Sequence, residues 1–244
     1  MKKLVISLFS VLLLASAVSF SEASESTANI AVQSVSRMGE KWCADRHAQK
    51  LAIVKEGDID LVFVGDSITH GWERAGKDVW AKYYGNRKAL NLGYGADRTE
   101  HVIWRLTNGE MDGISPKLVI LMIGTNNVGH RSSTPEQTVE GIKKIIEIMK
   151  EKVPAAKILL LSVFPRSANP TDEMRVKVNE INSGLPALAD GETVLYLDFG
   201  KKFLTEDGLL PVEMMRDRLH PGAAGYEIWA QEVEPFVQKY VDGK

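Results

Sequence analysis

Five short and almost wholly apolar runs recur along the chain and alternate with longer amphipathic stretches. Runs of this kind are typical of strands that are buried on both faces of a sheet. In order, they are IDLVFVG (59–65), KALNLG (88–93), KLVILMIG (117–124), KILLLSVF (157–164) and TVLYLDF (193–199). Because these runs alternate with helical patterns, they predict an α/β fold with a five-stranded parallel sheet and right-handed crossovers.

The clearest amphipathic stretch covers residues 133–153. Thr134 suits an N-cap, Pro135 the first helical position, and Gln137 the last position of a capping box. One apolar face then repeats at helical spacing: Val139, Ile142, Ile145, Ile146 and Met149. A last helix is predicted after Pro221, with an inward face made of Tyr226, Trp229, Val233, Phe236, Val237 and Tyr240.

The N-terminus has a different pattern. Two lysines precede an apolar stretch that ends at Val18, and small or polar residues follow as far as Ala23. This layout predicts a secretory signal peptide over residues 1–23, with cleavage after Ala17 as the alternative. The apolar stretch is shorter than the roughly 20 residues that span a membrane. We therefore expect a secreted or periplasmic protein without stable membrane insertion after cleavage.

Residues 24–56 connect the signal peptide to the repeating pattern. They are predicted to contain a flexible leader, as far as about Ser36, and one helix from Met38 to Glu56. The apolar side of that helix is able to hold Trp42, Leu51 and Val54. Residues 57–244 then form the main domain.

Composition and charge narrow the classes of function. The chain has 244 residues, of which 44% are hydrophobic and 25% charged, as expected for a globular protein with one mid-sized domain. A formal charge of −2 leaves no basic footprint, so we expect no nucleic-acid partner. Cys43 is the only cysteine, which excludes an intrachain disulfide, and its helical surroundings predict a half-buried structural thiol.

Polar groups follow four of the predicted strands at the point where each strand ends. They lie at Asp66-Ser67 and in residues 93–98, 124–127 and 164–166. Sites in open parallel sheets form beyond the carboxyl ends of the strands. The pattern therefore predicts a functional site built from these segments.

Acyl transfer needs a nucleophile, a base that takes its proton, and a group that orients the base. Ser67 follows a strand in a turn relaxed by two glycines, although a serine in a turn is the simpler interpretation of this segment alone. Asp217 and His220 are three residues apart, so both side chains are able to face one way. A surface ion pair explains that pair equally well. His70 is too near Ser67 in the sequence to be the obvious base, and we interpret it as a turn or surface histidine.

Acyl transfer also needs hydrogen-bond donors where negative charge develops on the substrate. Asn126, just after the third strand, has a side-chain amide that can donate. The loop NLGYGADRT after the second strand offers backbone N–H groups. Both segments are also consistent with ordinary turns.

Four blocks in this order closely resemble the SGNH hydrolases, also called the GDSL esterase/lipase superfamily. They are GDSITHGW, NLGYGADRTEHVIWRL, GTNN and DRLHP, and the resemblance runs from about Gly57 to the C-terminus. The linking segments are similar to the bacterial branch related to platelet-activating-factor acetylhydrolase catalytic subunits. The resemblance implies a flavodoxin-like three-layer α/β/α sandwich and hydrolysis through an acyl-enzyme, with no metal and no cofactor. The branch suggests a homodimer by analogy.

Position by position, the resemblance assigns the roles at the site. Ser67 would be the nucleophile, His220 the general base and then acid, and Asp217 the group that orients it. The oxyanion hole would combine the Ser67 backbone N–H, the Asn126 side chain and the N–H of Ala96.

The chain departs from the family pattern at two positions. The family usually has glycine where this chain has Ala96, and an alanine N–H can serve if its φ is negative or if strain is tolerated. Gly95 is the alternative donor, and the methyl group of Ala96 would narrow the acyl pocket. Asn127 replaces the aspartate of many members.

Further residues are candidates for lining the pocket, with loop packing as the alternative for each. These candidates are Asp66, Trp72, Arg98, Asn127, His130 and Arg166. His47 and His101 lie on predicted helices and are interpreted as structural.

Together these features predict an exported serine esterase that removes short acyl groups, above all acetyl. An acetylated carbohydrate is the expected substrate, because an exported enzyme would meet one outside the cytoplasm. The alternatives are a lipid or lysophospholipid acylhydrolase, a thioesterase, and a non-catalytic binding module of the same fold.

Overall fold

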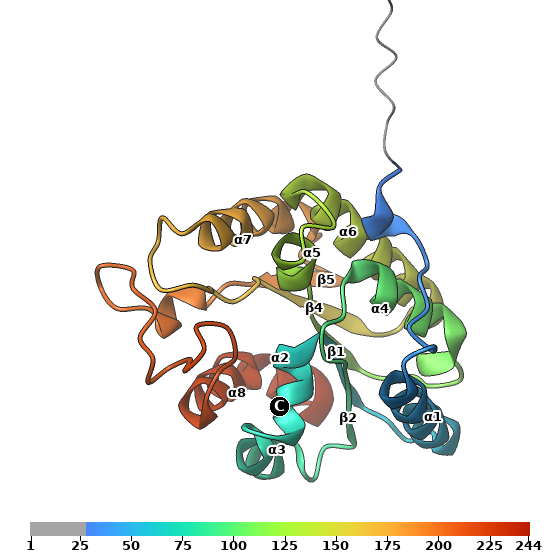
Figure 1. Cartoon of the computed structure of the whole chain (residues 1–244). Coiled ribbons are helices and arrows are strands. Elements are labelled where there is room, and N and C mark those ends of the chain that lie inside the picture. Colours follow the sequence, from blue (N-terminus) through green and yellow to red (C-terminus); the bar gives the residue numbers. More distant parts are fainter. Residues whose placement is uncertain (1–27) are drawn as a thin grey trace, which may run out of the picture.

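Five parallel strands form one sheet in the order β2-β1-β3-β4-β5 (Figure 1). The computed structural model describes residues 28–244, so the predicted signal peptide of residues 1–23 lies outside the described residues. The strands are β1 (Leu61–Gly65), β2 (Ala89–Gly93), β3 (Leu118–Met122), β4 (Lys157–Leu161) and β5 (Val194–Leu197). Each lies within one of the five apolar runs, and every neighbouring pair is parallel. The predicted sheet is thus confirmed.

Helices cover both faces of the sheet, which makes the three layers that the resemblance implied (Figure 1). Residues of α1, α4, α6 and α7 pack on one face, and residues of α2, α3 and α8 on the other. The helices are α1 (Lys41–Glu56), α2 (Ser67–His70), α3 (Lys77–Tyr84), α4 (Thr99–Arg105), α5 (Thr125–Gly129), α6 (Pro135–Lys152), α7 (Glu173–Gly184) and α8 (Ala223–Val237). Further helical turns are η1 (Ile30–Val32), η2 (Gly71–Glu73), η3 (Leu106–Glu110), η4 (Leu185–Leu188), η5 (Gly200–Phe203) and η6 (Gln238–Asp242).

The capping box predicted for α6 is present. The Thr134 side chain accepts a hydrogen bond from the Gln137 backbone N–H, and the Gln137 side chain accepts one from the Thr134 N–H. Pro135 occupies the first turn, where its missing N–H costs nothing.

The order of the strands determines where the predicted functional site lies in the fold. The chain leaves β1 to one side to form β2 and returns to the other side to form β3. The register pairs Gly65, the last residue of β1, with Gly93 of β2 and with Met122 of β3. The loops that follow these three strands therefore start side by side and diverge, which opens a crevice at the carboxyl edge of the sheet.

The two faces of the sheet have different cores. The face covered by α1, α4, α6 and α7 is mainly aliphatic, whereas the other face holds a cluster of aromatic rings. Trp72 lies inside that cluster, 1% exposed, with its ring centroid 5.1 Å from that of Trp229 and 4.6 Å from that of Tyr226. We predicted Trp72 as a pocket residue, and this was wrong, because the chain turns at η2 and directs the indole into the core.

Residues 28–36, the described part of the segment expected to be a flexible leader, pack against the rest of the fold. Ala31 is fully buried within η1, and the Asn29 side chain caps this turn and donates to Glu140 of α6 over 2.6 Å. The backbone N–H of Val35 donates to the Glu100 carbonyl over 3.1 Å. The segment therefore packs against α4 and α6 because its backbone and side chains find partners there.

The buried side of α1 is largely polar. Arg46, His47 and Lys50 are each 8% exposed, and Glu73 accepts hydrogen bonds from both Arg46 and Lys50. Trp42, which we placed on the inward side, is 41% exposed, so that prediction was wrong. Cys43 is more buried than expected, and burial raises the pKa of its thiol to about 11.

Among residues 28–244, no helix is both long and apolar enough to cross a membrane.

Candidate active site

Ser67 is the first residue of α2 and follows β1 by two positions. Asp66 forms the N-cap, and its carboxylate accepts a hydrogen bond from the Ile68 backbone N–H over 2.9 Å. As the first residue of the helix, Ser67 has a backbone N–H with no partner inside the helix. The turn thus presents both the hydroxyl and the N–H of Ser67 at the carboxyl edge of the sheet.

The glycines that flank Ser67 provide room. A Cβ at Gly65 would lie 2.2 Å from the Thr69 hydroxyl and 2.4 Å from the Met122 carbonyl, and one at Gly71 would lie 2.0 Å from the Tyr226 hydroxyl. Neither glycine has a positive φ. We predicted that these glycines relax the turn, and the structure shows instead that they allow close packing of α2 against β3 and α8.

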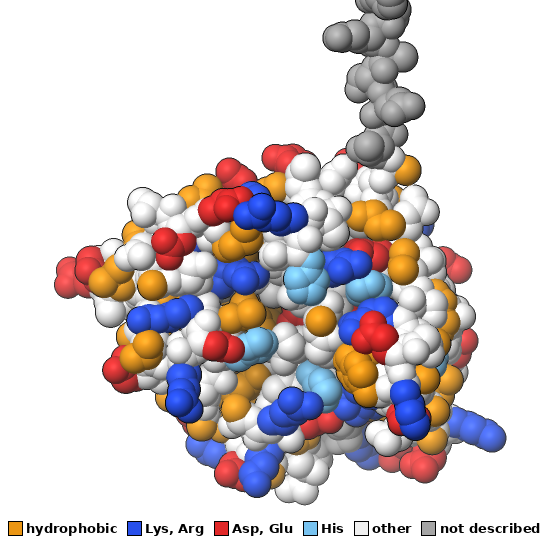
Figure 2. All heavy atoms as spheres, in the orientation of Figure 1, with side chains coloured by type: hydrophobic (Ala, Val, Ile, Leu, Met, Phe, Trp, Pro, Cys, Tyr) orange, Lys and Arg blue, Asp and Glu red, His pale blue; other side chains and the backbone are white. Residues whose placement is uncertain are grey.

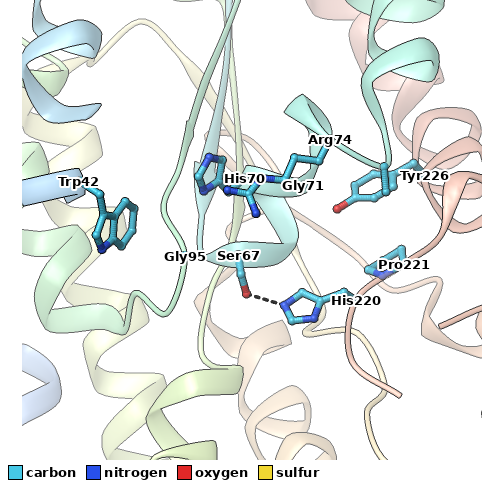
Figure 3. Close-up of a pocket in the computed structure, with 10 residues that line it drawn as sticks. Trp42, Ser67, His70, Gly71, Arg74, Gly95, His220, Pro221 and Tyr226 are labelled. Atoms are coloured by element: carbon cyan, nitrogen blue, oxygen red, sulfur yellow. Dashed lines mark hydrogen bonds between the residues drawn. The ribbon is translucent and has the colours of Figure 1, made fainter. Parts of the chain in front are cut away.

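Ser67, His220 and Asp217 form a row of hydrogen bonds. The Nε2 atom of His220 lies 2.8 Å from the Ser67 hydroxyl oxygen, and its Nδ1 atom lies 2.6 Å from a carboxylate oxygen of Asp217. Figure 3 shows the first of these contacts at the centre of the pocket. Geometrically, such a row can take a proton from the serine and stabilise the resulting imidazolium.

The loop that carries Asp217 and His220 is held by its own backbone. One Asp217 oxygen accepts hydrogen bonds from the N–H groups of Leu219 (3.1 Å) and His220 (2.8 Å), while the other faces the imidazole. Partial burial would raise the pKa of Asp217, but these hydrogen bonds outweigh it and hold the pKa below its usual value. Asp217 therefore stays ionised at neutral pH and accepts a hydrogen bond from the His220 ring.

The loop after β2 makes a tight turn over residues 94–97. The Asp97 N–H donates to the Tyr94 carbonyl over 3.2 Å, and Ala96, the third residue of the turn, has a φ of +61°. A positive φ at this position is the mark of a type II turn and costs an alanine roughly 1–2 kcal/mol. We expected the Ala96 N–H to serve as a donor either if φ is negative or if backbone strain is tolerated. The observed φ is positive, so the second condition applies. Gly95 lies beside it in the turn and lines the same pocket as Ser67.

Asn126 lies in α5, directly after β3. Its side-chain amide donates to the Asp97 carbonyl over 2.9 Å, which links α5 to the turn that holds Ala96. Asn127 is fully buried and bonds to Thr99: its side-chain oxygen accepts from the Thr99 N–H and its amide donates to the Thr99 hydroxyl. We predicted Asn127 as a candidate pocket residue, and this was wrong, because its buried side chain instead links α5 to α4 by hydrogen bonds.

A pocket of about 370 Å³ opens beside Ser67 and His220. Its walls include four side chains that we did not predict to line it: Trp42, His70, Arg74 and Tyr226. In Figure 3, Trp42 lies on the far side of Gly95 from Ser67, whereas Arg74 and Tyr226 lie on the side of His220. The rings of Trp42 and His70 stack, with centroids 6.4 Å apart and planes 12° apart.

Figure 2 shows the same face in space-filling form. Histidine side chains gather around a hollow near the middle of the face, and basic and acidic side chains are interspersed around it. His70 contributes to the pocket wall rather than to a simple surface turn. Burial, together with the nearby charge of Arg46, lowers the pKa of His70 to about 4, so the ring is neutral at neutral pH.

The other predicted pocket residues serve different contacts. Arg98 pairs with the buried Glu100 and lies 3.3 Å from His130, and Arg166 donates to the Thr125 carbonyl over 3.1 Å. None of them lines the pocket beside Ser67. Asp66 is 1% exposed, and burial raises its pKa to about 7.

The two histidines interpreted as structural are buried. His47 faces Glu110 over 3.0 Å, and His101 accepts the Arg98 N–H over 3.0 Å. Within residues 28–244, no three His, Cys, Asp or Glu side chains are grouped so that they could hold a metal ion.

The comparisons with known proteins agree with this fold. A model of the GDSL-like lipase/acylhydrolase family matches residues 63–228. The human platelet-activating factor acetylhydrolase IB subunit alpha1 is 36% identical over 188 residues, which cover 76% of this chain and 78% of that protein. Two proteins can share a fold at much lower sequence identity than this.

Solved structures share the architecture at lower identity. A GDSL-like lipase from Bacteroides thetaiotaomicron has a TM-score of 0.66 and 23% identity, covering 80% of this chain and 97% of that one. A catalytic mutant of Axe2, an acetylxylan esterase from Geobacillus stearothermophilus, has a TM-score of 0.57 and 19% identity, covering 75% and 94%. At these identities the likeness concerns the fold.

Proposed function

The chain belongs to the GDSL-like lipase/acylhydrolase family, and we propose that it is a serine esterase that removes acetyl groups from esters through an acyl-enzyme. The observation that carries this proposal is the row of hydrogen bonds from Asp217 through His220 to Ser67. A non-catalytic module of the same fold would have no need to keep that row together with the Asn126 amide.

In the proposed mechanism, the Ser67 oxygen attacks the ester carbonyl while Nε2 of His220 takes the hydroxyl proton. Asp217 stabilises the imidazolium that forms. The negative oxygen of the tetrahedral intermediate accepts hydrogen bonds from the backbone N–H groups of Ser67 and Ala96 and from the side chain of Asn126.

The intermediate then collapses, and the bond to the alcohol oxygen breaks. His220 gives its proton to that oxygen, and the alcohol leaves. Water attacks the acetyl group on Ser67, His220 takes a proton from the water and returns it to the serine, and acetate is released.

The names of two related proteins support acetyl as the acyl group. The human relative is named for the removal of an acetyl group, and the acetylxylan esterase that shares the fold is also named for one.

The pocket walls support a carbohydrate as the alcohol. The flat, partly exposed ring of Trp42 stacks on the neutral ring of His70, and such a surface suits the apolar face of a sugar ring. The proposed export of the protein would bring it to acetylated carbohydrates outside the cytoplasm.

A phospholipid-like ester is the second candidate. Arg74 is exposed at the pocket mouth, where its guanidinium can bind a phosphate. The human relative is named for a platelet-activating factor. Neutralising Arg74 separates the two candidates, because only a charged alcohol needs it.

An ester panel tests the proposal. We would measure hydrolysis of p-nitrophenyl esters from acetate to long chains, acetylated xylan, acetylated chitooligosaccharides and a lysophospholipid. We expect acetyl esters to react fastest and the sugar acetates to lose more activity than p-nitrophenyl acetate in Trp42→Ala. Faster hydrolysis of the lysophospholipid, lost in Arg74→Gln, would instead favour the second candidate.

The mechanism is tested with Ser67→Ala, which we expect to abolish hydrolysis of every active ester. Ser183→Ala is the matched control, because that exposed hydroxyl bonds only to its own helix at the Glu180 carbonyl. Full activity of Ser67→Ala would contradict the proposal.

A further inference from the structure

The peptide bond between Gly95 and Ala96 decides where the Ala96 N–H points. The described residues contain no cis peptide bond, so the carbonyl of Gly95 and the N–H of Ala96 point in opposite directions across one plane. Whatever holds the carbonyl therefore directs the N–H.

Arg37, in the segment before α1, holds that carbonyl. Its Nη1 atom donates to the Gly95 oxygen over 2.7 Å and to a carboxylate oxygen of Asp97 over 2.7 Å, so one group contacts both the second and the fourth residue of the turn. The side chain is only 12% exposed. Its other nitrogens donate to Glu40 over 2.9 and 3.0 Å, which orients the guanidinium plane.

The position of Arg37 shows which way the peptide faces. Its guanidinium lies 5.1 Å from the centre of the Trp42 ring. In Figure 3 Trp42 lies on the far side of Gly95 from Ser67. The Gly95 carbonyl points at Arg37, so the Ala96 N–H points away from Arg37, and we take it to face the side of Gly95 on which Figure 3 shows Ser67.

We propose that Arg37 is a positioning residue that sets the oxyanion donor of Ala96 by holding the Gly95 carbonyl. This inference rests on the proposed esterase function. It assigns the N-terminal segment, which precedes the residues matched by the family model, a role in the site.

The turn over residues 94–97 has a competing conformation, and Arg37 is needed to disfavour it. Rotating the Gly95–Ala96 peptide by about half a turn converts a type II into a type I turn and gives Ala96 a negative φ, which an L-residue prefers. The same rotation points the Ala96 N–H away from Ser67. Arg37 opposes the rotation, because it would lose the Gly95 carbonyl.

A double-mutant cycle tests the proposal with the full mature chain and p-nitrophenyl acetate. Arg37→Ala is expected to lower kcat by about 10- to 100-fold and to change KM less than about twofold, because an oxyanion donor acts in the transition state. In Ala96→Gly, the left-handed conformation carries no penalty. Arg37→Ala should therefore cost less than about threefold in kcat in that background.

Equal losses of kcat in both backgrounds would overturn the proposal, because a role limited to tethering α1 does not depend on residue 96. Unchanged kcat in Arg37→Ala would overturn it as well. The matched control is Arg87→Ala, which removes another largely buried arginine, paired with Glu234 and Asp242. It should lower the melting temperature without lowering kcat.

If Arg37→Ala does not fold, Arg37→Gln takes its place in the cycle, because its shorter side chain also releases the Gly95 carbonyl. Added guanidinium ion is expected to restore part of the kcat of Arg37→Ala, and the absence of any rescue would count against the proposal. Ser67→Ala distinguishes a failure of the proposed esterase mechanism from a failure of the proposed role of Arg37. Activity without Ser67 contradicts the esterase mechanism, whereas an inactive Ser67→Ala beside a fully active Arg37→Ala contradicts only the role of Arg37.

Discussion

The hydroxyl of Tyr226 donates a hydrogen bond to the backbone carbonyl of Ile68 over 2.6 Å and thereby ties α8 to α2. Ile68 directly follows Ser67, and Tyr226 also lines the pocket. The contact therefore joins the last helix of the chain to the turn that presents the proposed nucleophile. Its loss should affect both stability and catalysis.

In Tyr226→Phe, the Ile68 carbonyl loses a buried partner. We expect the free energy of unfolding to fall by about 1–2 kcal/mol and kcat to fall several-fold, as measured by urea denaturation and ester hydrolysis. Tyr83→Phe is the control, because its hydroxyl bonds to the Glu227 side chain at a more exposed position and not to the backbone of α2. A variant as stable and active as the wild type would show that the contact is dispensable.

His70 should not affect the pH dependence of hydrolysis near neutral pH. Because burial and the charge of Arg46 lower the pKa of His70 to about 4, its ring is neutral above about pH 5. We expect the kcat/KM profile of His70→Gln to keep the shape of the wild-type profile between pH 5 and 8, and His220→Gln to abolish activity. A profile of different shape in His70→Gln would mean that His70 titrates in this range.

The sheet could be predicted from the sequence because its strands are buried on both faces, so each is an unbroken apolar run. The order of the strands places Ser67 after β1 and Asn126 after β3, on either side of the crevice. The pairing of Ser67 with His220, 153 residues away, rested on the family resemblance, since spacing alone was equally consistent with a surface ion pair.

The apolar pattern did not predict which side of α1 is buried. The rule that apolar residues face inward failed because the buried side of this helix carries polar side chains, which find hydrogen-bond partners in Glu73 and Glu110. Trp42 was consequently assigned to the core, although it lines the pocket. The role of Arg37 left no signal in the sequence either, because its partners are a carbonyl and a carboxylate about 60 residues downstream.

Among residues 28–244, Arg175 donates to three backbone carbonyls and to no carboxylate. It is 2% exposed and donates to the carbonyls of Arg166 (2.6 Å), Ser167 (2.7 Å) and Gly208 (3.2 Å). The Ser167 N–H in turn donates to the Arg218 carbonyl over 2.8 Å, next to Asp217. Arg175 therefore supports the loop that carries the proposed base.

Arg175→Met keeps much of the volume and removes the donors. We expect the free energy of unfolding to fall by at least about 3 kcal/mol, because buried carbonyls lose their partners, and kcat to fall as the loop loosens. Arg131→Met, at an exposed arginine 3.5 Å from Glu173, should change stability by less than about 0.5 kcal/mol. Equal melting temperatures for both variants would contradict this account.

Asp66 makes the stability of the protein depend on pH in an unusual direction. Burial raises the pKa of its carboxyl from 3.8 to about 7 in the folded chain. Between these values the folded state keeps a proton that the unfolded state has lost. Stability from this group is therefore highest below about pH 4, falls as the pH rises, and levels off above about pH 7.

Asp66→Asn removes this titration and keeps the N-cap, because an asparagine oxygen can also accept the Ile68 N–H. We expect the variant to gain stability relative to the wild type as the pH rises from 4 to 8, by up to about 4 kcal/mol, in urea denaturation at several pH values. Asp190→Asn should show no such change over this range, because backbone hydrogen bonds from Val194 and Glu192 lower the pKa of Asp190, and its carboxylate is ionised in both the folded and the unfolded chain above about pH 5. A stability difference between Asp66→Asn and the wild type that stays constant from pH 4 to 8 would mean that Asp66 is ionised throughout, with its charge stabilised by the Ile68 N–H and the neighbouring His220 and Arg166.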